Sequence, residues 1–313
     1  MEPFDGCYFN SNRTFTNCIY GSSKTICTKL CQFGYERLVT MTQNIINHYK
    51  GYKAIFSDID GTILDDSDRL SKRNIHAIKN IINNGMVFVF ASGRSTRSIK
   101  KLFSEIKRSD FNAIAFNGCE ISIKGELVYR KTLENSNAVS IATTAIKQGI
   151  HVHAYSENNL VFHEKSEIAY RYSKHANLEP LFVESFIEYL KKKSITKLLI
   201  IAEPDDLFEI SEYFKRKFSD VNFVISGPEY LDVLPTEVDK GKALAFVCNE
   251  LGISHDDVVV IGDSENDLPM IEKAGLSIVM ENGLDKLKDR ADIVAPSNQD
   301  NGFAKIVERL FKI

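Results

Sequence analysis

The stretch KAIFSDIDGT, residues Lys53–Thr62, decides the fold of this chain. Its short apolar run predicts a buried strand, and the acids, glycine and threonine that follow predict a loop at the carboxyl end of that strand. Asp58 and Asp60 are two residues apart, so on an extended backbone their side chains would share one face. Two neighbouring carboxylates repel each other unless a cation or a shared proton relieves them. The pair therefore predicts a divalent metal site at the end of this strand.

Length and charge limit the classes of protein to which the chain can belong. A chain of 313 residues can hold two medium-sized domains, and we predict two. The net charge of -3, with acids and bases interspersed, leaves no basic stripe, so no nucleic-acid partner is expected. No apolar run approaches membrane-spanning length and residues 1–50 lack a secretory signal pattern, so we expect a soluble, cytoplasmic protein without a membrane partner. Nothing in the composition indicates a protein partner.

The cysteines fall into two groups. Four of the six lie within residues 1–50, a segment rich in polar residues that we interpret as an amino-terminal extension with one helix over Glu36–Tyr49. Cys27 and Cys31 have a spacing that suits a metal, but no histidine joins them before residue 48, so a metal site is disfavoured there. The other two, at positions 119 and 248, have apolar neighbours typical of reduced, buried thiols.

A β-α-β unit follows the first strand. Ser71 can cap a helix with an apolar face of isoleucines, and Gly85 ends that helix. Residues 86–91 then predict a strand that is apolar on both faces, as parallel strands covered by helices are. Further along the chain, residues 112–116 predict a third strand, and residues 120–131 predict a hairpin around Lys124-Gly125.

Polar, glycine-containing loops follow the second and third strands. Ser92-Gly93 stands before a helix predicted over residues 96–107, and a hydroxyl with free backbone N–H groups at such a position can hold a phosphate oxygen. Asn117-Gly118 follows the third strand. In open α/β sheets, chemistry occurs at the carboxyl ends of the strands.

From about residue 135 the pattern predicts a second α/β unit, inserted into the first. Strands are expected over 151–155, 160–162, 197–201 and 222–225, and helices over 137–148, 166–177 and 205–218. His151 and His153 share a strand face, but no ligand partner lies at a useful spacing, so we assign them no role. Tyr230–Pro235 is expected to lead back to the first unit.

The first unit then resumes. Asp239-Lys240-Gly241 opens a helix that runs to about Leu251, and residues 258–261 predict another fully apolar strand. This strand ends in an acid cluster, GDSEND, with Pro269 in the first turn of the next helix. Two further strands, over 276–280 and 292–295, are expected to complete the sheet. A helix over 301–311 closes the chain. The predicted fold is therefore α/β, with a doubly wound, mostly parallel sheet and an inserted α/β domain.

The strand ends together present a set of groups that suits phosphoryl transfer. Asp58 can attack phosphorus once Mg²⁺ screens its charge, Lys240 and Ser92 can hold phosphate oxygens, and Asp263 can complete the metal site. The motifs DxDGT, ASGR, DKG and GDxxND occur in this order. In this respect the chain resembles the haloacid dehalogenase superfamily. The insert between the second and third motifs resembles the C2-type cap of the Cof-type sugar-phosphate phosphatases.

The resemblance implies an enzyme that hydrolyses small phosphorylated metabolites with Mg²⁺. Asp58 would be the nucleophile that forms an aspartyl-phosphate, and Asp60 would protonate the leaving oxygen and then activate water. The implied phosphate- and substrate-binding residues are Ser92, Gly93, Asn117, Lys240 and Asn266. The implied metal-site residues are Asp58, Asp60 through its backbone carbonyl, Asp263 and Asp267. The implied domains are an extension (1–50), a core in two parts (51–135 and 234–313) and a cap (136–233).

Two other functions stay open. A phosphomutase of the same superfamily would share DxDGT and a related cap, but a mutase usually carries several arginines in its cap, and here only Arg171 and Arg216 lie well inside. A phospho-acceptor or metabolite-sensing regulator would hold phosphate on Asp58 without rapid turnover. A slow acceptor needs no acid or base beside its nucleophile, so Asp60 argues against a regulator.

Overall fold

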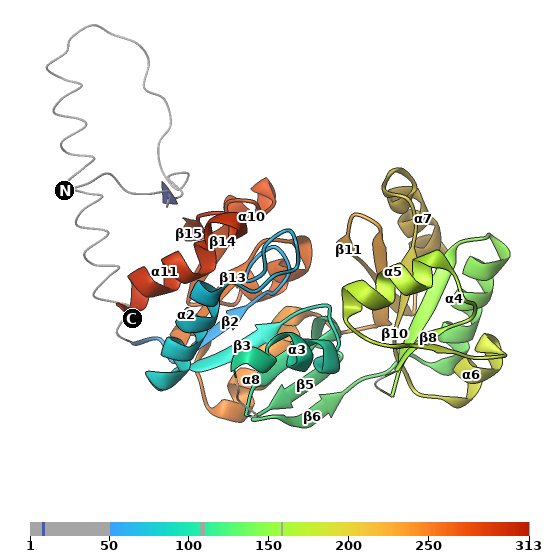
Figure 1. Ribbon diagram of the computed structural model, residues 1–313, viewed down its shortest axis with the longest axis horizontal. Coiled ribbons are helices and arrows are strands. Elements are labelled where there is room, and N and C mark those ends of the chain that lie inside the picture. Colours follow the sequence, from blue (N-terminus) through green and yellow to red (C-terminus); the bar gives the residue numbers. More distant parts are fainter. Residues whose placement is uncertain (1–7, 10–50, 107–109, 158, 313) are drawn as a thin grey trace, which may run out of the picture.

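The computed structural model of the protein describes residues 8–9, 51–106, 110–157 and 159–312. Within these ranges the chain forms two β-sheets with helices packed on them, one on each side of the molecule in Figure 1. Two expectations fall outside the described residues. They are the helix over Glu36–Tyr49 and the absence of a metal site at Cys27 and Cys31. Of the helices that the structure describes, none has the length and apolar character needed to span a bilayer.

The first sheet is mostly parallel. Its central strand is β2 (Ala54–Ser57), which pairs in parallel with β13 on one side and β3 on the other, so that Ile55 lies opposite both Val259 and Phe88. All four residues of β2 are buried, which is why the strand has no polar residue before its last position. Across the sheet the strands are β1 (Tyr8–Phe9), β15 (Ile293–Ala295), β14 (Leu276–Met280), β13 (Val258–Gly262), β2, β3 (Val87–Ala91), β4 (Asn112–Ala115), β5 (Glu120–Ile123) and β6 (Glu126–Arg130).

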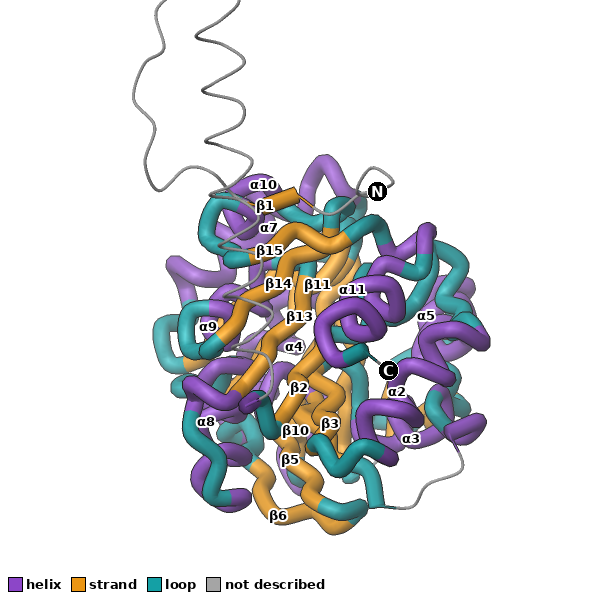
Figure 2. The backbone as a smooth tube through the Cα atoms, turned by 90° about the vertical axis from the view of Figure 1, so that its left-hand side faces the viewer, coloured by secondary structure: helices purple, strands orange, loops and turns teal. Residues whose placement is uncertain are grey.

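Helices cover both faces of this sheet, as predicted for a doubly wound fold. Figure 2, a view along the molecule, shows the two layers on either side of the strands. One face packs against α2 (Lys72–Asn83), α3 (Thr96–Leu102) and α11 (Gly302–Phe311). The other packs against α8 (Lys240–Leu251), α9 (Leu268–Ile271) and α10 (Asp285–Lys288).

Several local predictions are confirmed. The Ser71 side chain accepts a hydrogen bond from the backbone N–H of Asn74 and so caps α2. The hairpin of β5 and β6 turns at Lys124 and Gly125, both of which have positive φ, as a two-residue turn of this hand requires. Cys119 and Cys248 are buried and free. The helix predicted over 96–107 is shorter, because α3 ends at Leu102 and a 3₁₀ turn covers Ser104–Ile106.

The second sheet comes from the inserted segment and is mostly antiparallel, with only β8 and β9 parallel. Its order is β11 (Val221–Gly227), β12 (Tyr230–Pro235), β10 (Ile195–Ile201), β7 (His151–Ser156), β8 (Asn159–Phe162) and β9 (Pro180–Phe182). One face packs against α4 (Asn135–Lys147), α6 (Phe186–Lys192) and α7 (Pro204–Lys217). The other face packs against α5 (Glu167–Ala176) and is continuous with the core of the first sheet.

Tyr230–Pro235 leads back toward α8 as expected, but it is also a strand, which was not predicted. The segment is strand β12, which lies between β10 and β11 and pairs antiparallel with both. Its apolar residues alternate between the two faces of the sheet, and a connection would not need this pattern. Strand β9 and helix α6 were not predicted either, and they are only three and seven residues long. We propose that this second sheet with its helices is the cap.

Candidate active site

Asp58 and Asp60 follow strand β2, which ends at Ser57, and both line the same cavity. The extended backbone does not continue through them, because the chain turns after β2, with the N–H of Ile63 donating to the carbonyl of Ile59 at 2.9 Å. The two carboxylates therefore have different surroundings. Asp58 is buried, whereas the Asp60 side chain is 44% exposed.

Lys240 is the cation that the fold brings to Asp58. It is the first residue of α8, behind the N-cap Asp239, and its side chain is fully buried. Its Nζ lies 2.5 Å from Asp58 Oδ1 and 2.6 Å from Asp267 Oδ1. Burial alone would lower the pKa of Lys240, but the two carboxylates raise this pKa above its usual range. Gly241 follows because a side chain there would meet the carbonyl of Pro269, 2.2 Å from its Cβ, so only glycine lets α8 approach α9.

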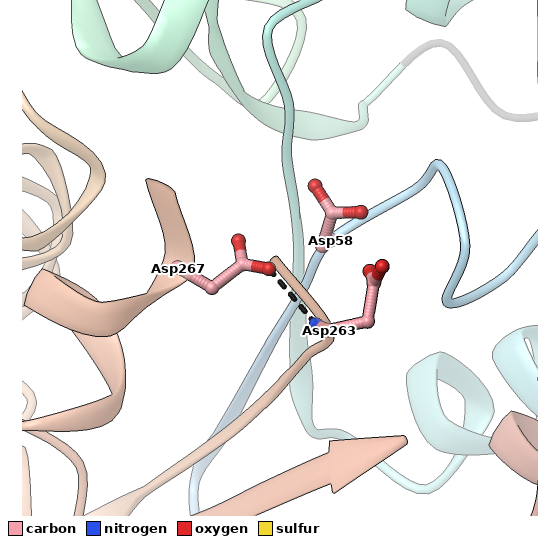
Figure 3. Close-up of side chains that lie close together, drawn as sticks. All are labelled: Asp58, Asp263 and Asp267. Atoms are coloured by element: carbon pink, nitrogen blue, oxygen red, sulfur yellow. Dashed lines mark hydrogen bonds between the residues drawn. The ribbon is translucent and has the colours of Figure 1, made fainter. Parts of the chain in front are cut away.

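Three carboxylates meet at the ends of β2 and β13. Oxygens of Asp58, Asp263 and Asp267 all lie within 4.8 Å of one another. Figure 3 shows the three side chains grouped together. Burial, followed by the charges of the neighbouring acids, raises the pKa of Asp58 well above its usual value, although Lys240 opposes the shift. Burial and Asp267 raise the pKa of Asp263 to about 7. One lysine does not offset three acids, so the cluster fits a divalent cation.

The oxygens that could bind such a cation differ in their present partners. Asp58 Oδ2 is buried and has no hydrogen-bond partner, and an orphaned buried oxygen of this kind suits a metal ion. Asp263 Oδ1 accepts a hydrogen bond from the Thr62 hydroxyl at 2.8 Å. Asp267 accepts from Lys240 with Oδ1 and from the N–H groups of Asp263 and Ser264 with Oδ2, at 2.9 and 3.0 Å. Asp267 thus orients its neighbours, whereas Asp58 and Asp263 each have one oxygen that could bind the cation.

The predicted substrate-binding residues lie on neighbouring loops. Ser92 Oγ is 3.4 Å from Asp60 Oδ2, and Gly93 lines the same cavity as Asp58 and Asp60. Asn117 and Asn266 are joined directly, with Asn266 Nδ2 donating to Asn117 Oδ1 at 3.0 Å. The structure therefore brings all the predicted residues to one edge of the sheet.

Arg94 is a site residue that the sequence analysis did not name. Its Nε donates to both carboxylate oxygens of Asp60 at 2.9 and 3.0 Å, and its Nη2 lies 2.6 Å from Asp60 Oδ1 and 2.9 Å from Asp68 Oδ1. Asp68 in turn contacts His175 Nδ1 of α5 at 3.1 Å. The signal was present, because Arg94 is the last residue of the quoted motif ASGR.

The second sheet forms the roof of the site. A cavity of about 490 Å³ lies beneath it and is lined by the loops after β2, β3 and β13 and by Tyr155, Tyr172, Lys197 and Tyr230. This volume suits a small ligand. Lys197 and its partner Asp232 were also missed, although each is the charged residue of a mostly apolar strand. That signal indicates a buried polar role.

The histidines of β7 stand apart from these acids. His151 Nε2 lies 3.2 Å from His153 Nδ1, and burial lowers the pKa of both residues, to about 4 for His151. His151 lines a separate cavity of about 710 Å³ in the second unit, together with His163. Among the described residues, the group of side chains close enough together to hold a metal ion is the aspartate cluster, and the two histidines are not part of it.

Comparison with known proteins places the chain in a family. Residues 55–307 match the family of haloacid dehalogenase-like hydrolases. The chain belongs to this family. A crystal structure from Thermotoga maritima is 33% identical, with a TM-score of 0.74, over 82% of this chain and 97% of that one. A haloacid dehalogenase-like hydrolase from Bacteroides thetaiotaomicron is 26% identical, with a TM-score of 0.77, over 83% and 100%.

A curated relative from Bacillus subtilis is named 5-amino-6-(5-phospho-D-ribitylamino)uracil phosphatase. It is 28% identical over 285 residues, which cover 82% of this chain and 98% of the relative. The resemblance and the α/β fold predicted from the motifs are thus confirmed, and this haloacid dehalogenase-like hydrolase is an enzyme of the phosphatase type.

Replacing Lys240 tests the electrostatics of the cluster. Lys240→Met leaves Asp58 and Asp267 buried without their counter-charge, so we expect the free energy of unfolding to fall by about 3–5 kcal/mol. Urea unfolding in EDTA measures this loss. Lys242→Met on the same helix is the matched control, because the Lys242 side chain is 57% exposed, and its effect should stay within about 0.5 kcal/mol. Equal unfolding free energies for the two variants would contradict the assignment.

Proposed function

We propose that this enzyme is a Mg²⁺-dependent phosphatase that hydrolyses small phosphate monoesters, sugar phosphates or related compounds, through an aspartyl-phosphate on Asp58. The observation that carries the proposal is the state of the Asp58 carboxylate. It is buried, one oxygen is held by Lys240, and the other has no hydrogen-bond partner. A carboxylate held in one orientation, with its second oxygen open to a metal ion, leaves the oxygen beside Lys240 to attack phosphorus.

The first step transfers the phosphoryl group to the enzyme. An Asp58 oxygen forms a bond to phosphorus while the bond from phosphorus to the ester oxygen breaks, and Asp60 donates a proton to that leaving oxygen. Lys240, Ser92 and Gly93 hold the transferring group. Asp58 and Asp263, with the backbone carbonyl of Asp60, would hold Mg²⁺, which supplies positive charge against the phosphoryl oxygens. Asp267 keeps Lys240 and the loop after β13 in place.

The second step releases inorganic phosphate. Asp60, now ionised, takes a proton from water, and the water oxygen forms a bond to phosphorus while the bond to Asp58 breaks. In the described arrangement Arg94 Nε and Nη2 donate hydrogen bonds to the oxygens of Asp60. To donate a proton in the first step Asp60 has to free one of these oxygens, so its contact with Arg94 has to loosen when substrate enters.

The charges around the cavity favour hydrolysis over mutase chemistry. A mutase has to hold a bisphosphate in two orientations, and spare cations in its cap would serve that purpose. Among the described residues that line the cavity, Lys197 is paired with Asp232, and Arg94 with Asp60 and Asp68. Arg171 in the cap is paired with Glu229. We therefore propose a substrate with a single phosphoryl group and an uncharged leaving part.

The relatives support a metabolite as the substrate. The Bacillus subtilis relative is named for a small compound that carries one phosphate, and a cavity of about 490 Å³ accommodates a compound of that class. A panel of phosphorylated metabolites tests the substrate class. Faster hydrolysis of phosphoproteins than of any small ester would contradict it.

A location in the cytoplasm stays a prediction from the sequence.

Metal removal is the direct test of the Mg²⁺ requirement. We expect excess EDTA to abolish hydrolysis of an aryl phosphate and added Mg²⁺ to restore it, because the aspartate cluster otherwise repels the anionic substrate. Ca²⁺ should inhibit, since it prefers more ligands at longer distances and would misplace Asp58 relative to phosphorus. Full activity in excess EDTA would refute the proposal.

A further inference from the structure

An ion pair buried in the roof of the site links the second sheet to the catalytic loops. Lys197 on β10 and Asp232 on β12 lie diagonally across neighbouring strands, with Lys197 Nζ 2.7 Å from Asp232 Oδ1. Their side chains are 3% and 0% exposed. Both alternate with residues that pack on α4, α6 and α7, so both face the core domain.

Each member of the pair contacts a different loop of the core. Lys197 Nζ donates to the carbonyl oxygen of Gly93 at 3.2 Å, and Asp232 Oδ2 accepts from Asn117 Nδ2 at 3.1 Å. A Cβ on Gly93 would lie only 3.5 Å from Asp232 Oδ2, so the cap side chain packs directly against this loop. Gly93 and Asn117 are both residues proposed to bind substrate.

The two core loops are also bonded to each other and to the metal loop. The N–H of Asn117 donates to the carbonyl of Ser92, and that of Phe116 to the carbonyl of Arg94, both at 2.9 Å. Asn266 donates to Asn117 Oδ1. Phe116 and Asn117 have φ of 50° and 55°, a conformation that is costly for a bulky residue such as phenylalanine and persists only where its surroundings hold it.

Stability alone does not account for charges at this position. Removing two ions from water is costly, and a well-packed apolar pair of similar volume is often as stable as a buried ion pair. Lys197 also lies over the rings of Phe116 and Tyr155, at 5.9 and 5.5 Å from their centroids, so an apolar side chain could fill the same space. The charged pair differs from an apolar one in its hydrogen bonds to the Gly93 and Asn117 loops.

We propose that Lys197 and Asp232 are positioning residues through which the cap assembles the phosphate site. The pair holds the Gly93 and Asn117 loops in the arrangement that binds the phosphoryl group, and Asn117 passes this constraint to Asn266 beside the metal cluster. The seating of the cap and the geometry of the phosphate site are therefore coupled. This inference rests on the proposed function, because it assigns phosphate binding to these loops.

The test replaces the pair by apolar side chains of similar size. Lys197→Met alone leaves Asp232 buried without its partner, so it should lower the unfolding free energy, and Lys197→Met/Asp232→Leu should recover most of that loss. The matched control is Lys191→Met/Glu188→Leu, an exposed pair on α6 of the cap with an Nζ to Oε1 distance of 2.6 Å. If the double variant fails to fold, Asp232→Asn, which keeps the side-chain volume, is measured in the same way.

Amide hydrogen exchange without ligand is the first measurement, because it does not depend on activity. We expect faster exchange at Phe116 and Asn117 in the double variant than in the wild type and the control, with other amides unchanged. Binding of inorganic phosphate in the presence of Mg²⁺ is the second. It should weaken by about tenfold to hundredfold, since a shift of about 1 Å in a positioned group can cost that much.

The outcomes separate the possible roles. Wild-type exchange and phosphate binding in a folded double variant would overturn the proposal and leave the pair as packing only. A higher KM for an aryl phosphate with unchanged affinity for inorganic phosphate would also overturn it, because Lys197 would then contact the leaving group. A wild-type protein that binds phosphate but hydrolyses no ester would refute the proposed function alone.

Discussion

Asp58→Asn is expected to reduce phosphatase activity to background, a loss of at least ~10⁴-fold, and to leave no phosphoenzyme that can be trapped. The substitution keeps the volume of the side chain but removes the oxygen nucleophile and one of the three acidic charges of the cluster. The fold should survive, because Lys240 retains its ion pair with Asp267 at 2.6 Å. Steady-state assays and acid quenching with labelled substrate measure the two effects.

The control for Asp58→Asn is another aspartate replaced in the same way. Asp285 begins α10, and its side chain is 97% exposed, so Asp285→Asn should keep wild-type kinetics. Thermal unfolding of both variants shows whether either has lost the fold. Measurable turnover by folded Asp58→Asn, or a phosphoenzyme on another residue, would rule out Asp58 as the nucleophile.

Asp60→Asn is expected to fail in a different way, with a loss of about 10²- to 10⁴-fold that depends on the leaving group. A sugar phosphate needs its leaving oxygen protonated and should suffer most, whereas an aryl phosphate has a leaving group that departs without a proton. With an aryl phosphate the phosphoenzyme should form and accumulate, because no base remains to activate water. Rapid-quench measurements on both substrates record this difference.

Arg94 complicates the interpretation of Asp60→Asn, because the substitution also removes a charge partner of the arginine. Arg94 keeps Asp68 at 2.9 Å, so it is not left unpaired. Asp68→Asn is the matched control, since it removes the other partner of Arg94 and leaves the proposed acid and base in place. It should preserve the wild-type ratio of activities on aryl and sugar phosphates. Equal losses on both substrates for Asp60→Asn, without a phosphoenzyme, would contradict this division of roles.

The sequence by itself determined the elements that depend on local patterns. Apolar runs such as Val258–Ile261 predicted buried strands, and helix N-cap residues such as Ser71 predicted where helices begin. Both signals depend on residues only a few positions apart. The positions of the four motifs followed from the same logic. Parallel strands place their carboxyl ends at one edge of the sheet, so polar residues after successive strands have to meet there.

Only the tertiary structure decided which side chains are paired at that edge. Lys240 and Asp58 are 182 residues apart and Lys197 lies 104 residues from Gly93, so no local period relates them. Asp267 has the residue type of a metal ligand, yet hydrogen bonds to Lys240 and two backbone N–H groups occupy both its oxygens. The place of β12 within its sheet was equally hidden, because strand order depends on pairing between distant segments. Local sequence encodes which residues are buried, and the packing of the two sheets decides which of them are partners.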